Sequence, residues 1–185
     1  MLRKLVVYAK GLALETRLRI FSVKTSGRLR VEGYSPIVEN YGTMVFGRKI
    51  SFRAQRKLPV LVKAKKGAVL TIGDGTFLNE GVSVVASQAI DIGRNCMIGD
   101  NAAIHDSHYH AVDEGDEISI APIRIGNNVW IGRNALIFPG VQIGDHSVIG
   151  AGSIVTRSIP SHSVAAGNPA RVIKRLSASD SFVRH

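Results

Sequence analysis

The stretch IGNNVWIGRNALIFPGVQIGDHSVIGAGSIV, residues 125–155, places an aliphatic side chain at every sixth position. The same spacing occurs upstream, and the full set comprises Ile72, Leu78, Val84, Ile92, Ile98, Ile104, Ile125, Ile131, Ile137, Ile143, Ile149 and Val155. A period of six matches neither an amphipathic helix, at about 3.6 residues per turn, nor a heptad. It is typical of short strands and tight corners that stack into a solenoid with an aliphatic core.

The residues between the aliphatic positions supply the chemistry of these corners. Two positions before an aliphatic residue stand small or β-branched side chains, such as Thr76, Cys96 and Ser147, which can pack beside it. Three positions after it stand residue types that tolerate a positive φ, namely Gly75, Gly81, Asn95, Asn101, Asn128, Asn134, Gly140, His146 and Gly152. We therefore expect stacked coils joined by backbone hydrogen bonds, with neighbouring strands about 4.8 Å apart.

Composition favours one soluble domain. The chain has 185 residues, of which 45% are hydrophobic, and a single cysteine, Cys96, which excludes a disulfide framework or a cysteine-rich zinc site. No apolar run approaches the roughly 20 residues that span a bilayer. Lys10 and Glu15 interrupt the apolar N-terminal residues, so we expect no cleaved signal peptide and a cytoplasmic location.

Three sequence motifs resemble those of a known family. NNVWIG at 127–132, GAGSIVT at 150–156 and AAGNPARVI at 165–173 resemble the hexapeptide-repeat acyltransferases, in the maltose/galactoside and polysaccharide O-acetyltransferase branch. The resemblance covers residues 36–176 and implies a mainly β fold, a left-handed parallel β-helix with three hexapeptides per coil, assembled as a homotrimer. Residues 1–35 are then a basic N-terminal helix or cap, and residues 177–185 form a C-terminal tail.

The repeat is interrupted once, by a polar segment at residues 105–122. Ile104 and Ile125 are 21 residues apart, and the segment between them carries His105, His108 and His110. We interpret it as a loop extruded from the solenoid, where catalytic side chains tend to lie. His105 directly follows the inward Ile104, so alternation predicts that it points outward as a surface residue.

The resemblance implies roles for two residues in acyl transfer. The loop of the family reads approximately D-S-D-F-H-P-I-D, and residues 106–113 read D-S-H-Y-H-A-V-D. His110 matches the catalytic base of the family, whereas His108 and Ala111 depart from the pattern. Asn79 matches an active-site asparagine that contacts the substrate or the acyl donor.

The same resemblance implies that acetyl-CoA is the acyl donor and that a hydroxyl of a sugar or surface glycan is the acceptor. Trp130 matches a residue that packs against coenzyme A, and Arg133, Ala151 and Thr156 match a groove for its pantetheine between subunits. Three cations, Arg157, Arg171 and Lys174, stand where the phosphates of the nucleotide would lie.

Other activities remain open at this point. His110 and His146 have the 36-residue spacing of the γ-class carbonic anhydrases, but Ala151 stands where a third histidine ligand is expected, so we predict no metal. The remaining alternatives are a β-helix scaffold without activity and an N-acetyltransferase of an amino sugar.

The first third of the chain is strongly basic. Residues 1–66 hold 16 Lys and Arg side chains against three acidic ones, within a net charge of +10 for the chain. A helix there would carry an apolar stripe formed by Leu2, Leu5, Val6, Ala9, Leu12, Ala13 and Ile20. This helix could cap the open end of the solenoid, and the excess charge predicts peripheral association with the anionic inner membrane face. Without a recognition motif, nucleic acid is not an expected partner.

Overall fold

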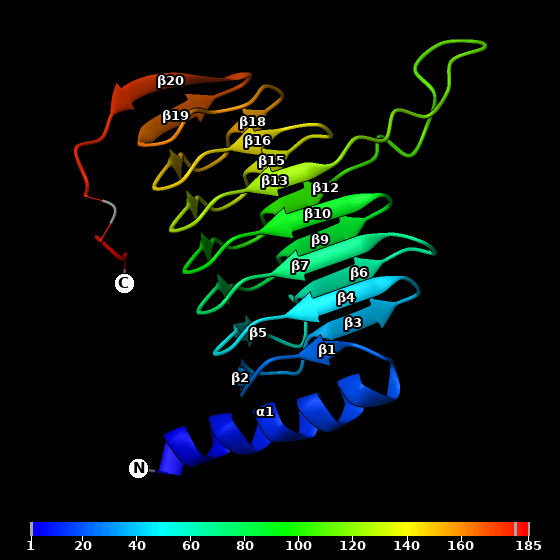
Figure 1. Ribbon diagram of the computed structural model, residues 1–185, viewed down its shortest axis with the longest axis vertical. Coiled ribbons are helices and arrows are strands. Elements are labelled where there is room, and N and C mark those ends of the chain that lie inside the picture. The colour runs from blue at the N-terminus through cyan, green and yellow to red at the C-terminus, as the bar shows by residue number, and fades with distance from the viewer. Residues whose placement is uncertain (1, 180, 185) are drawn as a thin grey trace.

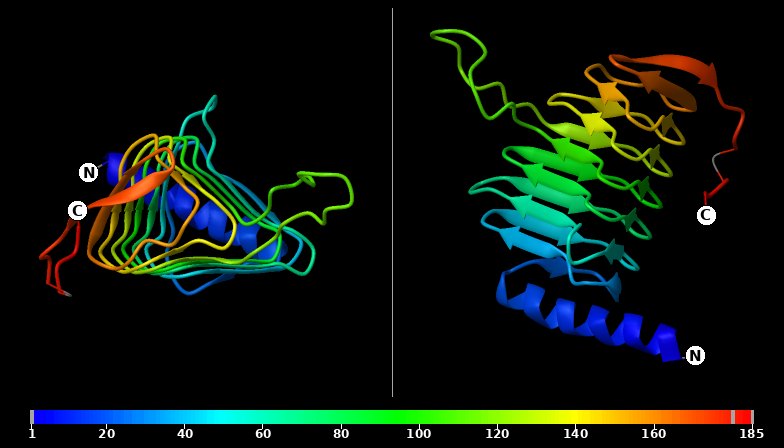
Figure 2. Two further views of the ribbon diagram at one scale, coloured as in Figure 1. Left: turned by 90° about the horizontal axis from the view of Figure 1, so that it is seen from above. Right: turned by 180° about the vertical axis from the view of Figure 1, so that it is seen from behind.

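The chain winds into an elongated three-sided solenoid with one helix across its N-terminal end (Figure 1). The computed structural model describes residues 2–179 and 181–184. Seen along the solenoid, the stacked coils superimpose on a triangular outline (Figure 2). The left-handed parallel β-helix implied by the family resemblance is confirmed, as are the stacked coils predicted from the repeat.

Each side of the solenoid is one sheet. Sheet A contains β1 (Lys24–Thr25), β4 (Thr43–Phe46), β7 (Val69–Ile72), β10 (Ala89–Ile92), β13 (Ile123–Ile125) and β16 (Gln142–Ile143). Sheet B contains β2 (Arg30–Gly33), β5 (Ser51–Ala54), β8 (Phe77–Leu78), β11 (Met97–Ile98), β14 (Trp130–Ile131), β17 (Val148–Ile149), β19 (Ser163–Gly167) and β20 (Ala170–Arg175). Sheet C contains β3 (Ile37–Asn40), β6 (Leu61–Ala64), β9 (Ser83–Ala86), β12 (Ala103–His105), β15 (Leu136–Ile137) and β18 (Ile154–Val155).

Two of the corners between the sheets matter for the site. Corner B–C, between sheets B and C, is built from the turns at 79–82, 99–102, 132–135 and 150–153. Corner C–A, between sheets C and A, is built from 87–88, 106–122, 138–141 and 156–158. The two corners therefore lie at the two edges of sheet C.

The repeat positions have the roles that the sequence predicted. All twelve aliphatic residues are inward and at most 2% exposed. All nine predicted corner residues, from Gly75 to Gly152, have a φ between 55° and 78°. The Asn and His residues among them accept this backbone conformation because their short polar side chains tolerate it. Inward aliphatics and left-handed corners together define the coil.

The solenoid begins earlier than the resemblance suggested, because β1 and β2 already belong to sheets A and B. The first coils are filled by larger side chains, and the rings of Phe46 and Phe52 lie 5.9 Å apart in the core. An extruded turn at Gln55–Leu58 lengthens the second coil. This turn disturbs the six-residue spacing, which explains why the repeat is hard to read before Ile72.

Helix α1 (Leu2–Ile20) covers the open end of the solenoid, but not through the predicted stripe. Leu14 and Leu18 are buried against the first coil, and Glu15 Oε1 accepts a hydrogen bond of 2.6 Å from Leu29 N. Gly11 also lies on this side, where a Cβ would overlap the carbonyl oxygen of Leu29. The apolar stripe that the sequence indicated, which includes Leu12, is exposed instead.

Candidate functional site

The extruded loop leaves corner C–A after β12 and returns at β13, standing out from the side of the solenoid (Figure 1). Its neck is a narrow antiparallel pair, in which Ser107 bridges Ile120 and His108 N donates to Ser119 O at 3.1 Å. The tip beyond the neck is exposed. The loop is thus fixed at its base and free at its tip.

Asp106 anchors the base of this loop to the preceding coil. Its side chain is fully buried, and its two carboxylate oxygens accept hydrogen bonds from the backbone N–H groups of Ser87, Gln88 and Ala89 at 2.6, 2.8 and 2.7 Å. Its carbonyl oxygen also accepts from Ala121 N at 3.0 Å, where the loop returns. Asp106 therefore holds both ends of the loop, the outgoing end through its carboxylate and the returning end through its backbone carbonyl.

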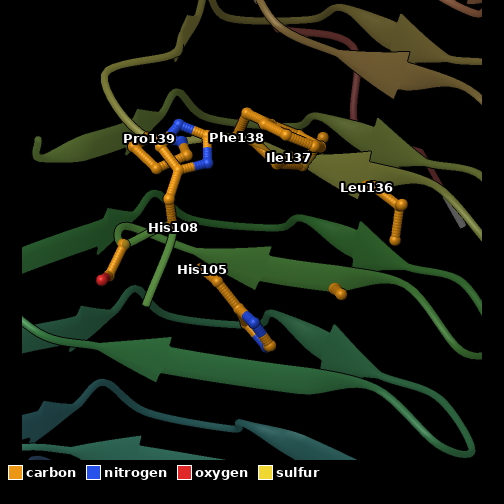
Figure 3. Close-up of a pocket in the computed structure, with 8 residues that line it drawn as sticks. His105, His108, Leu136, Ile137, Phe138 and Pro139 are labelled. Carbon is orange, nitrogen blue, oxygen red and sulfur yellow. The ribbon is translucent and has the colours of Figure 1, made fainter. Parts of the chain in front are cut away.

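A cavity of about 240 Å³ lies beside the loop, on the outer surface of sheet C. It is lined by Ala103, His105, Ser107, His108, Leu136, Ile137, Phe138 and Pro139. Figure 3 shows His108 beside Phe138 and Pro139, with His105 on the strand below. The cavity combines an apolar wall with two imidazoles, which suits a small organic group held near a proton acceptor.

His105 is better enclosed than alternation alone predicted. Its Nε2 lies 2.9 Å from Ser83 Oγ, and its ring meets the edge of Tyr109 at 5.8 Å between centroids. Burial lowers the pKa of His105 below its ordinary value, which favours the neutral imidazole. The side chain does leave the core as alternation requires, but the loop folds back over it. The expectation of an ordinary surface residue was wrong for that reason.

The other two loop histidines are exposed, and they differ in what they face. The ring of His108 lies 5.6 Å from that of Phe138, at the cavity wall. Tyr109, with a φ of 64°, turns back so that its ring lies 4.5 Å from Lys65 Nζ. His110 follows this turn and does not line the cavity within its own chain. His110 is therefore an exposed loop residue outside the lining of the cavity.

Asn79 lies at corner B–C, on the opposite edge of sheet C from the loop. Its Oδ1 is buried and has no hydrogen-bond partner among the residues that the structure describes. A buried amide oxygen without a partner is costly, and a water molecule, an ion or a functional role of the residue can account for it. Arg133 and Ala151 lie on the same corner further along the solenoid, where Gly152 N donates to Arg133 O at 2.8 Å.

The remaining predicted residues are spread over the C-terminal half of the solenoid, and all are exposed. Thr156 and Arg157 lie at corner C–A, two coils beyond the start of the loop. Trp130 projects from sheet B with 47% of its surface exposed, and Arg171 and Lys174 lie on β20. Within one chain, the structure thus groups Asn79 with Arg133 and Ala151 on one corner. It places His110, Thr156 and Arg157 on the other.

Asp106 and Ser83 were missed by sequence reasoning. A signal for Asp106 was present, because it is two residues after the inward Ile104 and alternation turns it inward as well. A carboxylate on an inward position requires hydrogen-bond donors, and the backbone of the preceding corner supplies them. No group of three or more His, Cys, Asp and Glu side chains suited to a metal ion occurs within residues 2–179 and 181–184.

Comparisons with known proteins agree with this geometry. Residues 122–157 match the family described as hexapeptide repeat of succinyl-transferase. Galactoside O-acetyltransferase of Escherichia coli (strain K12) is 44% identical over 118 residues, which cover 62% of this chain and 58% of the relative. The chain therefore matches little more than half the length of this curated relative.

Two solved structures extend the comparison. A maltose O-acetyltransferase from Clostridium difficile 630 is 32% identical with a TM-score of 0.59, over 80% of this chain and 71% of that one. A galactoside acetyltransferase in complex with coenzyme A is also 32% identical with a TM-score of 0.59, over 87% and 74% of the two chains. The chain belongs to the hexapeptide-repeat acyltransferases, in the branch of the galactoside and maltose O-acetyltransferases.

Proposed function

We propose that this protein is an O-acetyltransferase, which moves an acetyl group from acetyl-CoA to a hydroxyl of a sugar or surface glycan. The observation that carries the proposal is the anchored loop with three histidines, extruded from a β-helix of this family beside a cavity. Relatives named as galactoside and maltose O-acetyltransferases support the reaction type and the sugar class of acceptor.

The proposed chemistry needs a general base for the acceptor hydroxyl and a hydrogen-bond donor for the oxyanion. An alcohol is a poor nucleophile at neutral pH, so the neutral imidazole of His110 takes its proton during attack on the thioester carbonyl. A backbone N–H stabilises the oxyanion, and the imidazolium returns the proton to the departing thiolate of coenzyme A. The unpartnered Oδ1 of Asn79 is available to orient the acceptor or the acyl donor. No covalent intermediate with the enzyme is required.

The binding site for the acyl donor, acetyl-CoA, is proposed to run along the C-terminal coils. Exposed cations at Arg157, Arg171 and Lys174 suit the phosphates of coenzyme A, because each presents N–H donors and a positive charge. Trp130 offers an exposed aromatic surface, and Arg133, Ala151 and Thr156 flank the path of the pantetheine. The galactoside acetyltransferase solved with coenzyme A supports this choice of ligand.

A complete site requires two chains in this proposal. His110 and Asn79 lie at opposite edges of sheet C, so one chain does not bring them together. A neighbour whose corner B–C packs against corner C–A of the first chain would do so. Such a contact joins different surfaces of identical chains, and it closes into a ring of three when each rotation is a third of a turn. We therefore propose a homotrimer.

Release of coenzyme A thiol tests the function directly. The protein is mixed with acetyl-CoA and a panel of galactosides, maltosides, nucleotide sugars and amino sugars, and the free thiol is followed with a chromogenic reagent. Burial raises the pKa of Cys96 to about 11, so the protein itself should contribute little signal. We expect thiol release that depends on a hydroxyl acceptor. Release only with amino sugars would identify an N-acetyltransferase, and neither release nor a thermal shift with acetyl-CoA would indicate a scaffold.

A further inference from the structure

Helix α1 has an apolar face that nothing in the described chain covers. Leu5, Leu12 and Ile20 are 68%, 64% and 76% exposed, and Val6 is 47% exposed. At 100° per residue these side chains share one side of the helix with two exposed alanines. We call this surface the outer face, and it comprises Leu5, Val6, Ala9, Leu12, Ala13 and Ile20. Because α1 lies across the N-terminal end of the solenoid (Figure 1) and buries its opposite side, with Leu14 and Leu18, against the first coil, the outer face is directed away from the solenoid.

The outer face is fixed in this direction by polar contacts on both sides of the helix. Lys10 Nζ donates to Gly33 O at 2.6 Å, and the guanidinium of Arg17 donates to Pro36 O at 2.9 Å. Glu15 accepts from the backbone of Leu29 on the buried side. Rotating the helix to bury the outer face would break these bonds and expose Leu14 and Leu18. The apolar surface is therefore a stable feature of the fold, and such surfaces commonly mark interaction sites.

Unbalanced positive charge surrounds this face. Three cations further along the solenoid form ion pairs, Arg48 with Asp74, Arg53 with Glu32 and Lys63 with Glu39. By contrast, Arg19, Lys24 and Arg28 are exposed near the helix and form no ion pair with another described residue. An apolar strip bordered by cations is the profile of a helix that lies in the interface of a bilayer.

We infer that the outer face of α1 docks the protein onto an anionic lipid bilayer. The helix would lie in the plane of the surface, since none of the described helices is long and apolar enough to cross a membrane. A second copy of the chain is a poorer occupant, because two such ends would bring like charges together. A neighbour packed beside the solenoid would cover its sheets and leave its end free.

Docking in this orientation leaves the candidate site accessible. The loop leaves the fourth coil, after β12, whereas α1 lies below the first. With strands about 4.8 Å apart, the loop stands roughly 20 Å further from the membrane than the helix does. The inference does not depend on the proposed function, and vesicle binding is measured without acetyl-CoA.

Co-sedimentation of the full-length protein with vesicles tests the inference. We expect binding to vesicles of phosphatidylcholine with phosphatidylglycerol, weakening as salt rises, and little binding to phosphatidylcholine alone. Leu12→Glu should lower the partition coefficient about tenfold or more, as the transfer of one leucine side chain predicts. Arg19→Ala should lower it about fivefold, the factor expected for one cation near the surface. Ile173→Glu, which alters an equally exposed residue at the opposite end of the solenoid, should have no effect.

Three results would overturn the inference. The first is equal binding to both kinds of vesicle, or to neither. The second is a loss with Ile173→Glu as large as that with Leu12→Glu, which would show that the outer face is not specific. The third is a smaller assembly for Leu12→Glu in sedimentation velocity, which would identify a second copy as the occupant. Thermal unfolding of each variant, compared with the parent protein, establishes that a loss of binding is not a loss of fold.

Discussion

Replacing His110 with Ala is expected to lower kcat for acetyl transfer about a hundred- to ten-thousand-fold, with the affinity for acetyl-CoA nearly unchanged. The reason is that general base catalysis contributes a factor of this size, and the proton transfer occurs only in the transition state. His110 is exposed on the loop, whereas the cations assigned to the acyl donor lie on later coils, after β18 and on β20. Steady-state kinetics for kcat and calorimetry for coenzyme A affinity separate the two effects.

His108→Ala and His105→Ala are the matched controls in the same loop region. Both residues line the cavity of their own chain, whereas His110 does not. We expect a much smaller loss of kcat from His108→Ala than from His110→Ala. If His105→Ala or His108→Ala abolishes turnover and His110→Ala does not, the base belongs to the cavity of one chain. The matching of residues 106–113 to the family loop would then be wrong.

Asp106→Ala is expected to cost about 3–5 kcal/mol of unfolding free energy. The substitution removes a buried carboxylate and leaves the N–H groups of Ser87, Gln88 and Ala89 without acceptors. Breaking a buried, charge-assisted network of this kind has a cost in that range. The loop should lose its anchor in the same variant, so activity should fall as well.

Chemical denaturation measures this cost, with Glu117→Ala as the control. Glu117 is an exposed acidic residue in the same loop and makes no hydrogen bond with a described residue, so its removal should change stability by less than about 0.5 kcal/mol. Asp106→Asn should be intermediate, because the amide keeps one acceptor oxygen. Equal midpoints for Asp106→Ala and Glu117→Ala would mean that the loop is not anchored through this carboxylate.

The solenoid could be predicted from sequence because each coil is specified by a short pattern of residues, and this pattern is repeated along the chain. An inward aliphatic such as Ile131 and a left-handed corner such as Asn134 recur at fixed offsets, and each coil repeats the same physical solution. A single irregular coil would carry no such signal. The turn at Gln55–Leu58 shows this, since it hides two earlier coils that have the same architecture.

The orientation of α1 could not be predicted in the same way. The helix has apolar side chains on two sides, and the sequence ranks the stripe with Leu5 and Leu12 above the side with Leu14 and Leu18. Which side docks is decided by the shape of the first coil, where only Gly11 permits close approach to the Leu29 carbonyl. This close approach depends on the tertiary structure, so the helical periodicity of the sequence does not predict it.

The candidate site was predictable in part. The break in the repeat located the loop, but the fold of the loop over His105 depends on long-range contacts such as Tyr109 with Lys65. The residues assigned from the family remain predictions, because one chain separates His110 from Asn79. In our proposal a second copy of the chain brings His110 and Asn79 together. The sequence of one chain does not show this contact between copies.

Complementation between two inactive variants therefore tests the central claim most directly. His110→Ala and Asn79→Ala chains are co-expressed with different tags, and trimers that contain both are purified. Each shared site draws His110 from one chain and Asn79 from the next, so every ring of three that contains both variants should have one intact site, about a third of its sites. We predict recovery of about a third of the parent turnover, with each variant alone nearly inactive. Mixed trimers that remain as inactive as the separate variants would contradict a site shared between chains.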